Sequence, residues 1–326
     1  MKRSILSLLI VAAIGFAPAR ASGTAESAYL ITLGTGGGPV IQTKRSRPAN
    51  AVVVNDSVYL FDLGAGTLAQ LAKADLAPGK VKGVFLSHHH IDHVADLGPF
   101  LINRWLLYGD AAIPVKGPRG TRDMVAAIAA MSGPVALAPV TIGGTPRPPL
   151  SQTVAAKDLD DPMHKVKVIY KDENVRVLAV QNDHYHFEPG SAADRYSRSY
   201  AFRIETGGRA IVYTGDTGWS ERVVDLARGA DLLVSEVIDI AGVEQAMRRN
   251  PAVPESALPA LLAHMEQDHL TPRQVGEMAK AAGVSKVVLT HLVPGGDDET
   301  DSSQYAADVA KVFSGPVIVA NDLDRF

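Results

Sequence analysis

The sequence predicts an α/β fold, in which buried strands alternate with helices. Apolar runs of strand length recur along the chain, and several are followed by a turn and a segment with helical periodicity. Polar side chains stand directly after several of these runs, at the carboxyl ends of the predicted strands. Ligands of open α/β sheets bind at this edge, so the same pattern predicts where the functional site lies.

Two stretches of the chain share one order of elements. In each, a strand and turn (residues 58–64 and 210–216) lead into a helix-like segment and then a second apolar strand (81–86 and 231–234). This order predicts two αβ halves related by pseudo-symmetry, with the functional site along their shared seam. Further strands are predicted at residues 29–33, 51–54, 166–170, 175–181 and 200–205.

Helices are predicted at residues 94–108 and 272–282. The second has clear boundary signals, with Thr271 as the N-cap, Pro272 at the first helical position and Gly283 just past the end. Residues 132–162 are rich in proline and glycine and have little periodicity, so we expect an irregular excursion over the surface.

The first 21 residues are typical of a secretory signal peptide. Two basic residues precede an apolar run over residues 5–17, and Ala19-Arg20-Ala21 fits an A-x-A cleavage site. We therefore expect a single mature domain over residues 22–326, in a periplasmic or secreted location; an uncleaved membrane anchor is the alternative. No later apolar stretch is long enough to cross a bilayer, so no stable membrane insertion is expected after the signal is removed.

The charge balance and the lack of cysteine exclude several kinds of function and of metal site. The chain has 32 basic and 35 acidic residues, and removal of Lys2, Arg3 and Arg20 leaves 29 − 35, a net charge of about −6. This balance argues against a general nucleic-acid binder, whose affinity depends on cationic side chains. The chain has no cysteine, which excludes disulfides and thiolate metal ligands. Any metal ligands must therefore be histidine or carboxylate side chains.

The motif His88-His89-His90-Ile91-Asp92-His93 follows a predicted strand and precedes a predicted helix. On such a turn His88 and His90 project to one side, while Asp92 and His93 reach a neighbouring point, so one loop serves two cations. Imidazole and carboxylate ligands suit zinc or a similar metal. His89 is expected to face solvent or backbone. The alternative is an adventitious histidine cluster, which the fixed Asp92 and His93 disfavour.

Other candidate ligands also stand at strand ends. These are His184 in Asn182-Asp183-His184-Tyr185-His186, Asp216 in Gly215-Asp216-Thr217, and His291 after Thr290. The glycine-rich loop at residues 34–39 lacks the Gly-Lys-Ser/Thr ending of a phosphate-binding loop. We expect its backbone to approach the active site instead.

These motifs resemble the metallo-β-lactamase superfamily, a family of metal-dependent hydrolases with a four-layer αβ/βα sandwich. Within it the chain is most similar to tRNase Z and its arylsulfatase and phosphodiesterase-like relatives. The similarity is carried by Leu60-Phe61-Asp62-x-Gly64-x-Gly66-Thr67, by Tyr213-Thr214-Gly215-Asp216-Thr217, and by His269-Leu270-Thr271 leading into Leu289-Thr290-His291.

The resemblance implies two divalent metal ions, with zinc expected and manganese as the alternative. It assigns His88, His90 and His184 to one metal, Asp92, His93 and His291 to the second, and Asp216 to a bridge between them. His184 is preferred over His186 because it directly follows Asp183. The bridging Asp216 favours the phosphodiesterase, sulfatase, lactonase and glyoxalase II branches over the true β-lactamases.

Two metals about 3.5 to 4 Å apart lower the pKa of a water between them and present hydroxide to the electrophile. We expect Asp92 to orient this hydroxide as well as to bind metal. By similarity to tRNase Z, His269 contacts the scissile phosphate and protonates the leaving oxygen; a local hydrogen bond at the helix start is the alternative. Asp62 and Glu236 are expected to hold the loops by accepting backbone N–H bonds. The sequence leaves a role for His186 or His264 open.

The sequence departs from tRNase Z in ways that predict a different substrate. Its Pro-x-Lys-x-Arg-Asn loop is degenerate, with only Lys44, Arg47 and Asn50, and no basic glycine-rich arm is evident. We therefore expect an exported hydrolase of a small anionic ester, either a phosphodiester or an aryl sulfate, with no nucleic-acid partner. A lactonase or β-lactamase-like hydrolase and a non-catalytic metal-binding protein are the alternatives. A homo-oligomer is left open.

Overall fold

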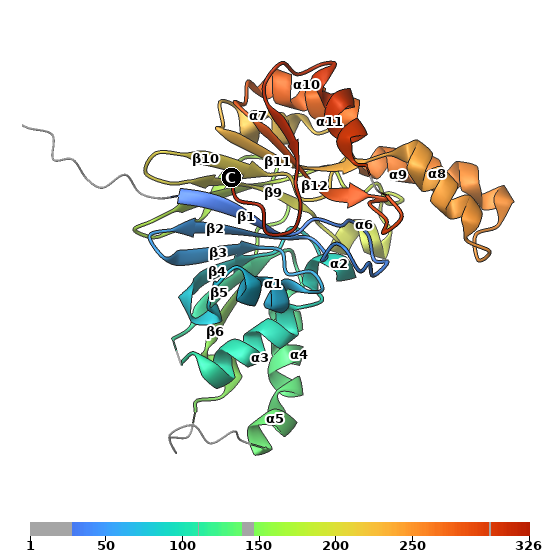
Figure 1. The fold of residues 1–326 in the computed structure, drawn as a ribbon. Helices are drawn as coiled ribbons and strands as arrows, with labels where there is room; N and C mark the ends of the chain where they lie inside the picture. Colours follow the sequence, from blue (N-terminus) through green and yellow to red (C-terminus); the bar gives the residue numbers. More distant parts are fainter. Residues whose placement is uncertain (1–27, 110, 139–146, 300) are drawn as a thin grey trace, which may run out of the picture.

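The computed structural model describes residues 28–109, 111–138, 147–299 and 301–326. Two β-sheets lie face to face, and helices cover the outer side of each sheet (Figure 1). This arrangement confirms the predicted four-layer αβ/βα sandwich. The predicted signal peptide, residues 1–21, lies outside the described residues, so export and the start of the mature chain stay predictions.

The first sheet has the order β1-β2-β3-β4-β5-β6. β1, β2 and β3 pair antiparallel, whereas β3 to β6 are parallel. The strands span Ala28–Gly34 (β1), Ala49–Val54 (β2), Ser57–Phe61 (β3), Val81–Phe85 (β4), Ile113–Gly117 (β5) and Val154–Asp158 (β6).

The second sheet has the order β13-β12-β11-β10-β9-β8-β7. β10 to β13 are parallel, and β7 to β10 pair antiparallel. The strands span Lys167–Lys171 (β7), Arg176–Gln181 (β8), Tyr200–Glu205 (β9), Ala210–Tyr213 (β10), Leu232–Ile238 (β11), Val287–Val293 (β12) and Val317–Val319 (β13). The two predicted αβ halves correspond to the two sheets, since residues 58–64 lie in the first and 210–216 in the second.

The central strands are apolar on both faces because both faces are covered. In β2, Ala51 and Val53 point to the helices outside the first sheet, while Val52 and Val54 point into the core between the sheets. This alternation follows from the twofold repeat of a strand. Strands buried on both faces have nearly continuous apolar runs, which is why the central strands could be recognised in the sequence.

Helices of both outer layers pack on their sheets through separate apolar cores. Two further helices, α8 and α9, extend away from the sheets (Figure 1), and α9 ends directly before His269. The helices are α1 (Thr67–Lys73), α2 (Ile91–Val94), α3 (Leu97–Leu107), α4 (Thr121–Met131), α5 (Gly133–Leu137), α6 (Ala192–Tyr196), α7 (Glu221–Ala227), α8 (Ile240–Arg249), α9 (Leu258–Asp268), α10 (Pro272–Ala282) and α11 (Ser303–Ala310).

The predicted helix boundaries are partly correct. For α10 they are confirmed: Thr271 and Gln274 form a capping box, and Gly283 ends the helix with a φ of 64°. The predicted helix at 94–108 is wrong at its start, because α2 and α3 are separate helices there. The break falls at Asp96, whose side chain accepts a hydrogen bond from the Leu68 N–H at 3.1 Å.

The expectation of an irregular excursion at 132–162 is also wrong in part. Its residues 154–158 form β6, the edge strand of the first sheet, and 133–137 form α5. β6 is exposed or half-buried along its length, so it lacks the apolar run that marks the central strands. Over the parts of the chain that the structure describes, no helix has the length and apolarity needed to cross a bilayer.

Aromatic side chains hold the two sheets together. Phe85 of the first sheet is fully buried, and its ring centroid lies 5.0 Å from Phe61 on the same sheet, and 6.2 Å from Phe202 and 5.5 Å from Tyr170 on the other. Each such ring buries a large apolar area and adds favourable ring contacts.

We predict that Phe85→Ala lowers the free energy of unfolding by about 3 to 5 kcal/mol, because it leaves a cavity between the sheets. Urea denaturation of the purified protein measures the loss. The control is Val168→Ala at a half-exposed position of β7, which should change stability by less than about 1 kcal/mol. A loss for Phe85→Ala as small as that of the control would show that these rings do not join the sheets.

Candidate metal centre

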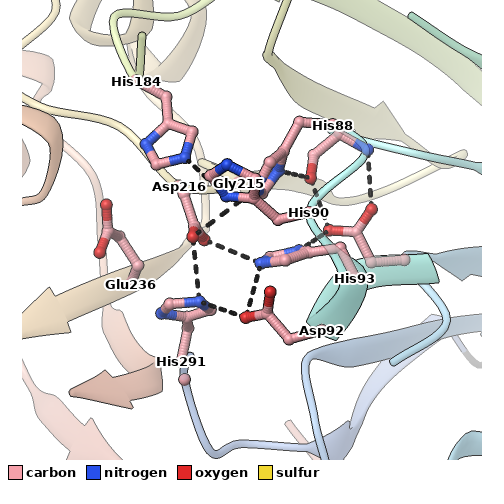
Figure 2. Close-up of polar contacts among 12 residues, drawn as sticks. His88, His90, Asp92, His93, His184, Gly215, Asp216, Glu236 and His291 are labelled. Carbon is pink, nitrogen blue, oxygen red and sulfur yellow. Dashed lines mark hydrogen bonds and ion pairs between the residues drawn. The ribbon is translucent and has the colours of Figure 1, made fainter. Parts of the chain in front are cut away.

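The candidate ligands meet at the carboxyl ends of strands from both sheets (Figure 2). All seven side chains named from the sequence are brought together, although they span some two hundred residues of chain. They are His88, His90, Asp92 and His93 after β4, His184 after β8, Asp216 after β10, and His291 within β12.

Four of these side chains form a first group. His88, His90, His184 and Asp216 each offer a ligand atom, and these atoms lie within 4.8 Å of one another. His90 Nδ1 is 3.3 Å from His184 Nε2, and His88 Nε2 is 3.9 Å from Asp216 Oδ2. Three imidazoles and a carboxylate suit a tetrahedral divalent cation such as zinc.

A second group consists of Asp92, His93 and His291, again within 4.8 Å of one another. Asp216 reaches this group too, because its Oδ1 lies 3.3 Å from His93 Nε2 and its Oδ2 lies 3.0 Å from His291 Nε2. Asp216 therefore stands between the two groups, as a carboxylate shared by two cations must.

Several nitrogen and oxygen atoms of the centre are buried without a hydrogen bond to any described residue. They include His88 Nε2, His93 Nε2, His291 Nε2 and Asp216 Oδ1. The contacts to Asp216 are short but lack hydrogen-bond geometry. Buried polar atoms are nearly always bonded. Lone pairs that converge in this way fit two divalent cations, so the residues present match the ligand groups that the sequence predicts.

Asp62 orients the motif loop. It directly follows β3 with a φ of 59° and is fully buried. Its Oδ1 accepts the Ser87 N–H at 2.7 Å; its Oδ2 accepts the Ser87 hydroxyl at 2.7 Å, His93 Nδ1 at 2.8 Å and the Tyr213 hydroxyl at 2.8 Å. The bond to His93 leaves Nε2 of that ring directed at the centre. The expected backbone contact is present, but Asp62 does more than hold a loop.

Two other ligands are oriented through Nδ1 in the same way. The Ser87 hydroxyl lies 3.0 Å from His88 Nδ1, and the Asp268 carbonyl accepts from His184 Nδ1 at 3.0 Å. Sequence reasoning missed Ser87, Tyr213 and Asp268. Ser87 stands directly before the motif and could have been noticed; the contacts of Tyr213 and Asp268 cross the fold and leave no local signal.

The two ligand groups differ in the pKa shifts of their side chains. Burial lowers the pKa of His184 to about 3, so this imidazole is neutral, as a metal ligand must be. Burial also disfavours the charged form of His291, but Asp216 and Asp92 outweigh it and raise the pKa of His291 to about 10. Burial would raise the pKa of Asp216, yet His291 and His93 hold it well below its usual range. Cations that bind here would therefore displace protons from the second group.

His269 lies beside the centre without belonging to either group. Its ring centroid is 5.1 Å from that of His184 and 6.0 Å from that of His291, one imidazole from each group. Its Nδ1 is 2.7 Å from Glu236 Oε2, while Glu236 Oε1 accepts the Thr217 N–H at 2.6 Å. Burial lowers the pKa of His269, but Glu236 outweighs this effect and raises it overall. Glu236 thus orients His269 and also holds the loop at Thr217.

The other histidines near the motifs point elsewhere. His89 Nε2 is 2.9 Å from the Thr121 hydroxyl, so it contacts a side chain rather than the expected solvent or backbone. His186 and His264 both contact the Asp268 carboxylate, at 2.7 and 3.2 Å, and neither joins a ligand group. The structure places His184 in the centre and His186 outside it.

The glycine-rich loop approaches the centre as expected. Gly37 donates its N–H to the Leu292 carbonyl at 3.0 Å. A methyl group on Gly37 would stand 2.6 Å from His291 Nδ1 and 2.5 Å from Val293 Cγ2. His291 itself has a φ of 46° and lies where the pairing of β11 and β12 shifts register. The loop and this irregularity together fix the direction of the His291 ring.

Comparisons with known proteins agree with this geometry. A family model described as "Beta-lactamase superfamily domain" matches residues 58–292. Ribonuclease Z of Mycobacterium bovis is 28% identical over 302 residues, covering 90% of this chain and 96% of the relative. Ribonuclease Z of Mycolicibacterium paratuberculosis is 29% identical, covering 90% and 95%. Together, the family match and these relatives support a metal-dependent hydrolase.

Solved structures share the fold. The metallo-beta-lactamase fold protein YhfI from Bacillus subtilis aligns with a TM-score of 0.64 at 20% identity, covering 92% of this chain and 98% of that one. Human tRNase Z, short form, aligns with a TM-score of 0.62 at 23% identity, covering 91% and 98%.

The relatives contradict the predicted substrate and partners. Proteins named ribonuclease Z match nearly the whole chain, against the expectation of a small phosphodiester or aryl sulfate ester as substrate and of no nucleic-acid partner. That expectation rested on the net charge and on the degenerate loop at Lys44, Arg47 and Asn50. Net charge describes the whole surface and says little about the field inside a single site, so it was a weak guide to the substrate.

We predict that Asp62→Asn weakens zinc binding by about 10- to 100-fold, because an amide cannot accept all the hydrogen bonds that orient Ser87 and His93. Titration of metal-stripped protein against a competing chelator measures the affinity. Asp56→Asn, at an exposed position, is the matched control. If both variants bind zinc like the wild type, the Asp62 carboxylate does not orient the ligands.

A second prediction concerns the glycine loop. Gly37→Ala should displace the His291 ring and reduce the metal content from two cations per chain toward one, as measured by elemental analysis after dialysis. Gly208→Ala is the control, because a methyl group there meets open space. Full occupancy in Gly37→Ala would mean that the loop does not position His291.

Proposed function

We propose that this chain, which belongs to the beta-lactamase superfamily, is a two-metal phosphodiesterase that hydrolyses RNA. The observation that carries the proposal is the placement of His269 beside both ligand groups, held by Glu236. A structured RNA such as a tRNA precursor is the proposed substrate, supported by similarity to ribonuclease Z over 90% of the chain. We propose zinc as the metal, because the ligands are imidazoles and carboxylates.

When bound, the two cations activate a water molecule and stabilise negative charge on the phosphoryl oxygens. Asp92 is positioned to orient that water. Its Oδ2 lies 3.6 Å from His93 Nε2 and 3.5 Å from His291 Nε2, and the carboxylate can accept a hydrogen bond from the attacking water. Asp92 is thus proposed both to bind metal and to direct the nucleophile.

The ribose oxygen that leaves phosphorus is a strong base and needs a proton. His269 can supply it: Glu236 holds Nδ1, and Nε2 lies on the opposite edge of the ring. The negative charge of Glu236 stabilises the protonated imidazole. In the proposed reaction, the attacking water loses one proton to solvent, a bond from its oxygen to phosphorus forms, and the bond to the ribose oxygen breaks. The His269 proton passes to that oxygen, and His269 then regains a proton from solvent.

We predict that His269→Ala lowers the rate of RNA cleavage by about 10²- to 10⁴-fold while metal content stays unchanged. The substrate is a tRNA precursor with a 3′ extension, and cleavage is followed on denaturing gels under single-turnover conditions. The control is His264→Ala, a half-exposed histidine outside both ligand groups, which should retain activity within about twofold.

A second substrate distinguishes loss of proton donation from structural damage in the His269→Ala variant. Bis(p-nitrophenyl) phosphate releases a leaving group that needs no proton, so His269→Ala should cleave it at nearly the wild-type rate, whereas Asp216→Ala should lose activity on both substrates. An equal loss on both substrates in His269→Ala would contradict proton donation. A wild-type enzyme that cleaves bis(p-nitrophenyl) phosphate but no RNA would contradict the proposed substrate.

A further inference from the structure

A cavity of about 330 Å³ lies beside the loop that carries His184. Its lining residues come from three segments: residues 162–164, the loop after β8 at 181–187, and residues 194–199 at the end of α6 and the turn before β9. None of the candidate metal ligands lines it. Pockets for small ligands have volumes of about 300 to 1,000 Å³, so this cavity has room for a ligand group of its own.

Tyr185 connects this cavity to the metal centre. It lines the cavity, and its ring centroid is 4.7 Å from that of His184 and 5.4 Å from that of His90. Both imidazoles belong to the first ligand group. A group bound in the cavity would therefore lie one side chain away from a substrate atom at the first ligand group.

A second aromatic side chain, Phe187, lines the cavity next to Tyr185. The two rings are nearly parallel, with an interplanar angle of 22° and centroids 4.9 Å apart. Both residues are half-buried, and neither belongs to the apolar cores of the described residues. The rings therefore do not serve to fill a core, and they offer aromatic surface on which a flat ligand can stack.

The charges around the cavity disfavour an anionic ligand. Its titratable lining residues are His164, Asp183, Tyr185, Asp194 and Arg198. Arg198 is already paired, with its Nε 2.5 Å from Asp161 Oδ1, and Asp183 is paired with Arg222. A phosphate would meet the negative charge of Asp194 and no unpaired guanidinium or ammonium group among the described lining residues. A neutral, flat group with polar edges suits this lining better, and a nucleobase has these properties.

We propose that the cavity binds a nucleobase of the RNA substrate, from a nucleotide that flanks the scissile phosphate. The inference rests on the proposed function. Proteins bind unpaired bases by stacking them on aromatic side chains, which tolerate any sequence because every base has a π-face. Phe187 and Tyr185 supply the stacking contact. The base in the cavity holds the strand in place while the neighbouring phosphate lies at the metal centre.

The test is a scan of single abasic substitutions across the nucleotides that flank the cleavage site of a tRNA precursor. We expect the wild-type enzyme to lose about tenfold in kcat/KM at one of these nucleotides, the loss of one stacked base. Phe187→Leu keeps apolar bulk without an aromatic ring. It should show a similar loss on the intact substrate and little further loss at that nucleotide, with metal content and unfolding temperature like those of the wild type. Phe187 is varied because Tyr185 also contacts the first ligand group.

Two control variants should retain the wild-type abasic profile. Phe187→Tyr keeps an aromatic ring in the cavity, and Tyr108→Leu removes an exposed ring that lies outside it. A wild-type scan with no sensitive nucleotide, or the same sensitivity in Phe187→Leu, would overturn the inference while leaving RNA cleavage in place. A wild-type enzyme that cleaves no RNA would overturn both this inference and the proposed function.

Discussion

The buried carboxylate of Asp62 is the constraint on which the centre depends. It follows β3 in the first sheet and accepts hydrogen bonds from Ser87 and His93 of the motif loop and from Tyr213 of the second sheet. A buried charge is unfavourable unless it is fully hydrogen-bonded. Four donors meet that requirement only when both sheets and the loop are in place, so the hydrogen bonds that stabilise Asp62 also set the ligand geometry.

The same chemical arrangement recurs around the site. His93, His269 and His186 each contact a buried carboxylate through Nδ1, and His184 donates Nδ1 to a backbone carbonyl. In each case the protein holds Nδ1 and thereby sets the direction in which Nε2 points. His291 and His90 differ from this arrangement. His291 Nδ1 has no hydrogen bond to a described residue, and its ring lies against the Gly37 loop; His90 Nδ1 faces His184 Nε2 within the first ligand group.

The proximity of the candidate ligands could be predicted from the sequence because they follow a local rule. The motif loop is contiguous, and the remaining ligands stand at strand ends that meet at one edge of the fold. The choice of His184 over His186 agrees with the structure, but not for the reason given, since Asp183 pairs with Arg222. The role of Asp268 could not be predicted, because it depends on two segments 82 residues apart meeting at one carboxylate. The edge strand β6 was missed because it has no apolar run to reveal it.

The substrate was the least predictable feature, for a physical reason. A net charge of −3 describes the whole chain, but beyond about 8 to 10 Å exposed charges are screened at physiological salt. Under the proposed function, the local field of two cations and the neighbouring imidazoles would act on the phosphodiester. An acidic surface reduces general attraction to nucleic acid, yet it leaves that local field intact. For the proposed RNA substrate, whole-chain charge would therefore affect the rate of association more than the cleavage of the bound phosphodiester.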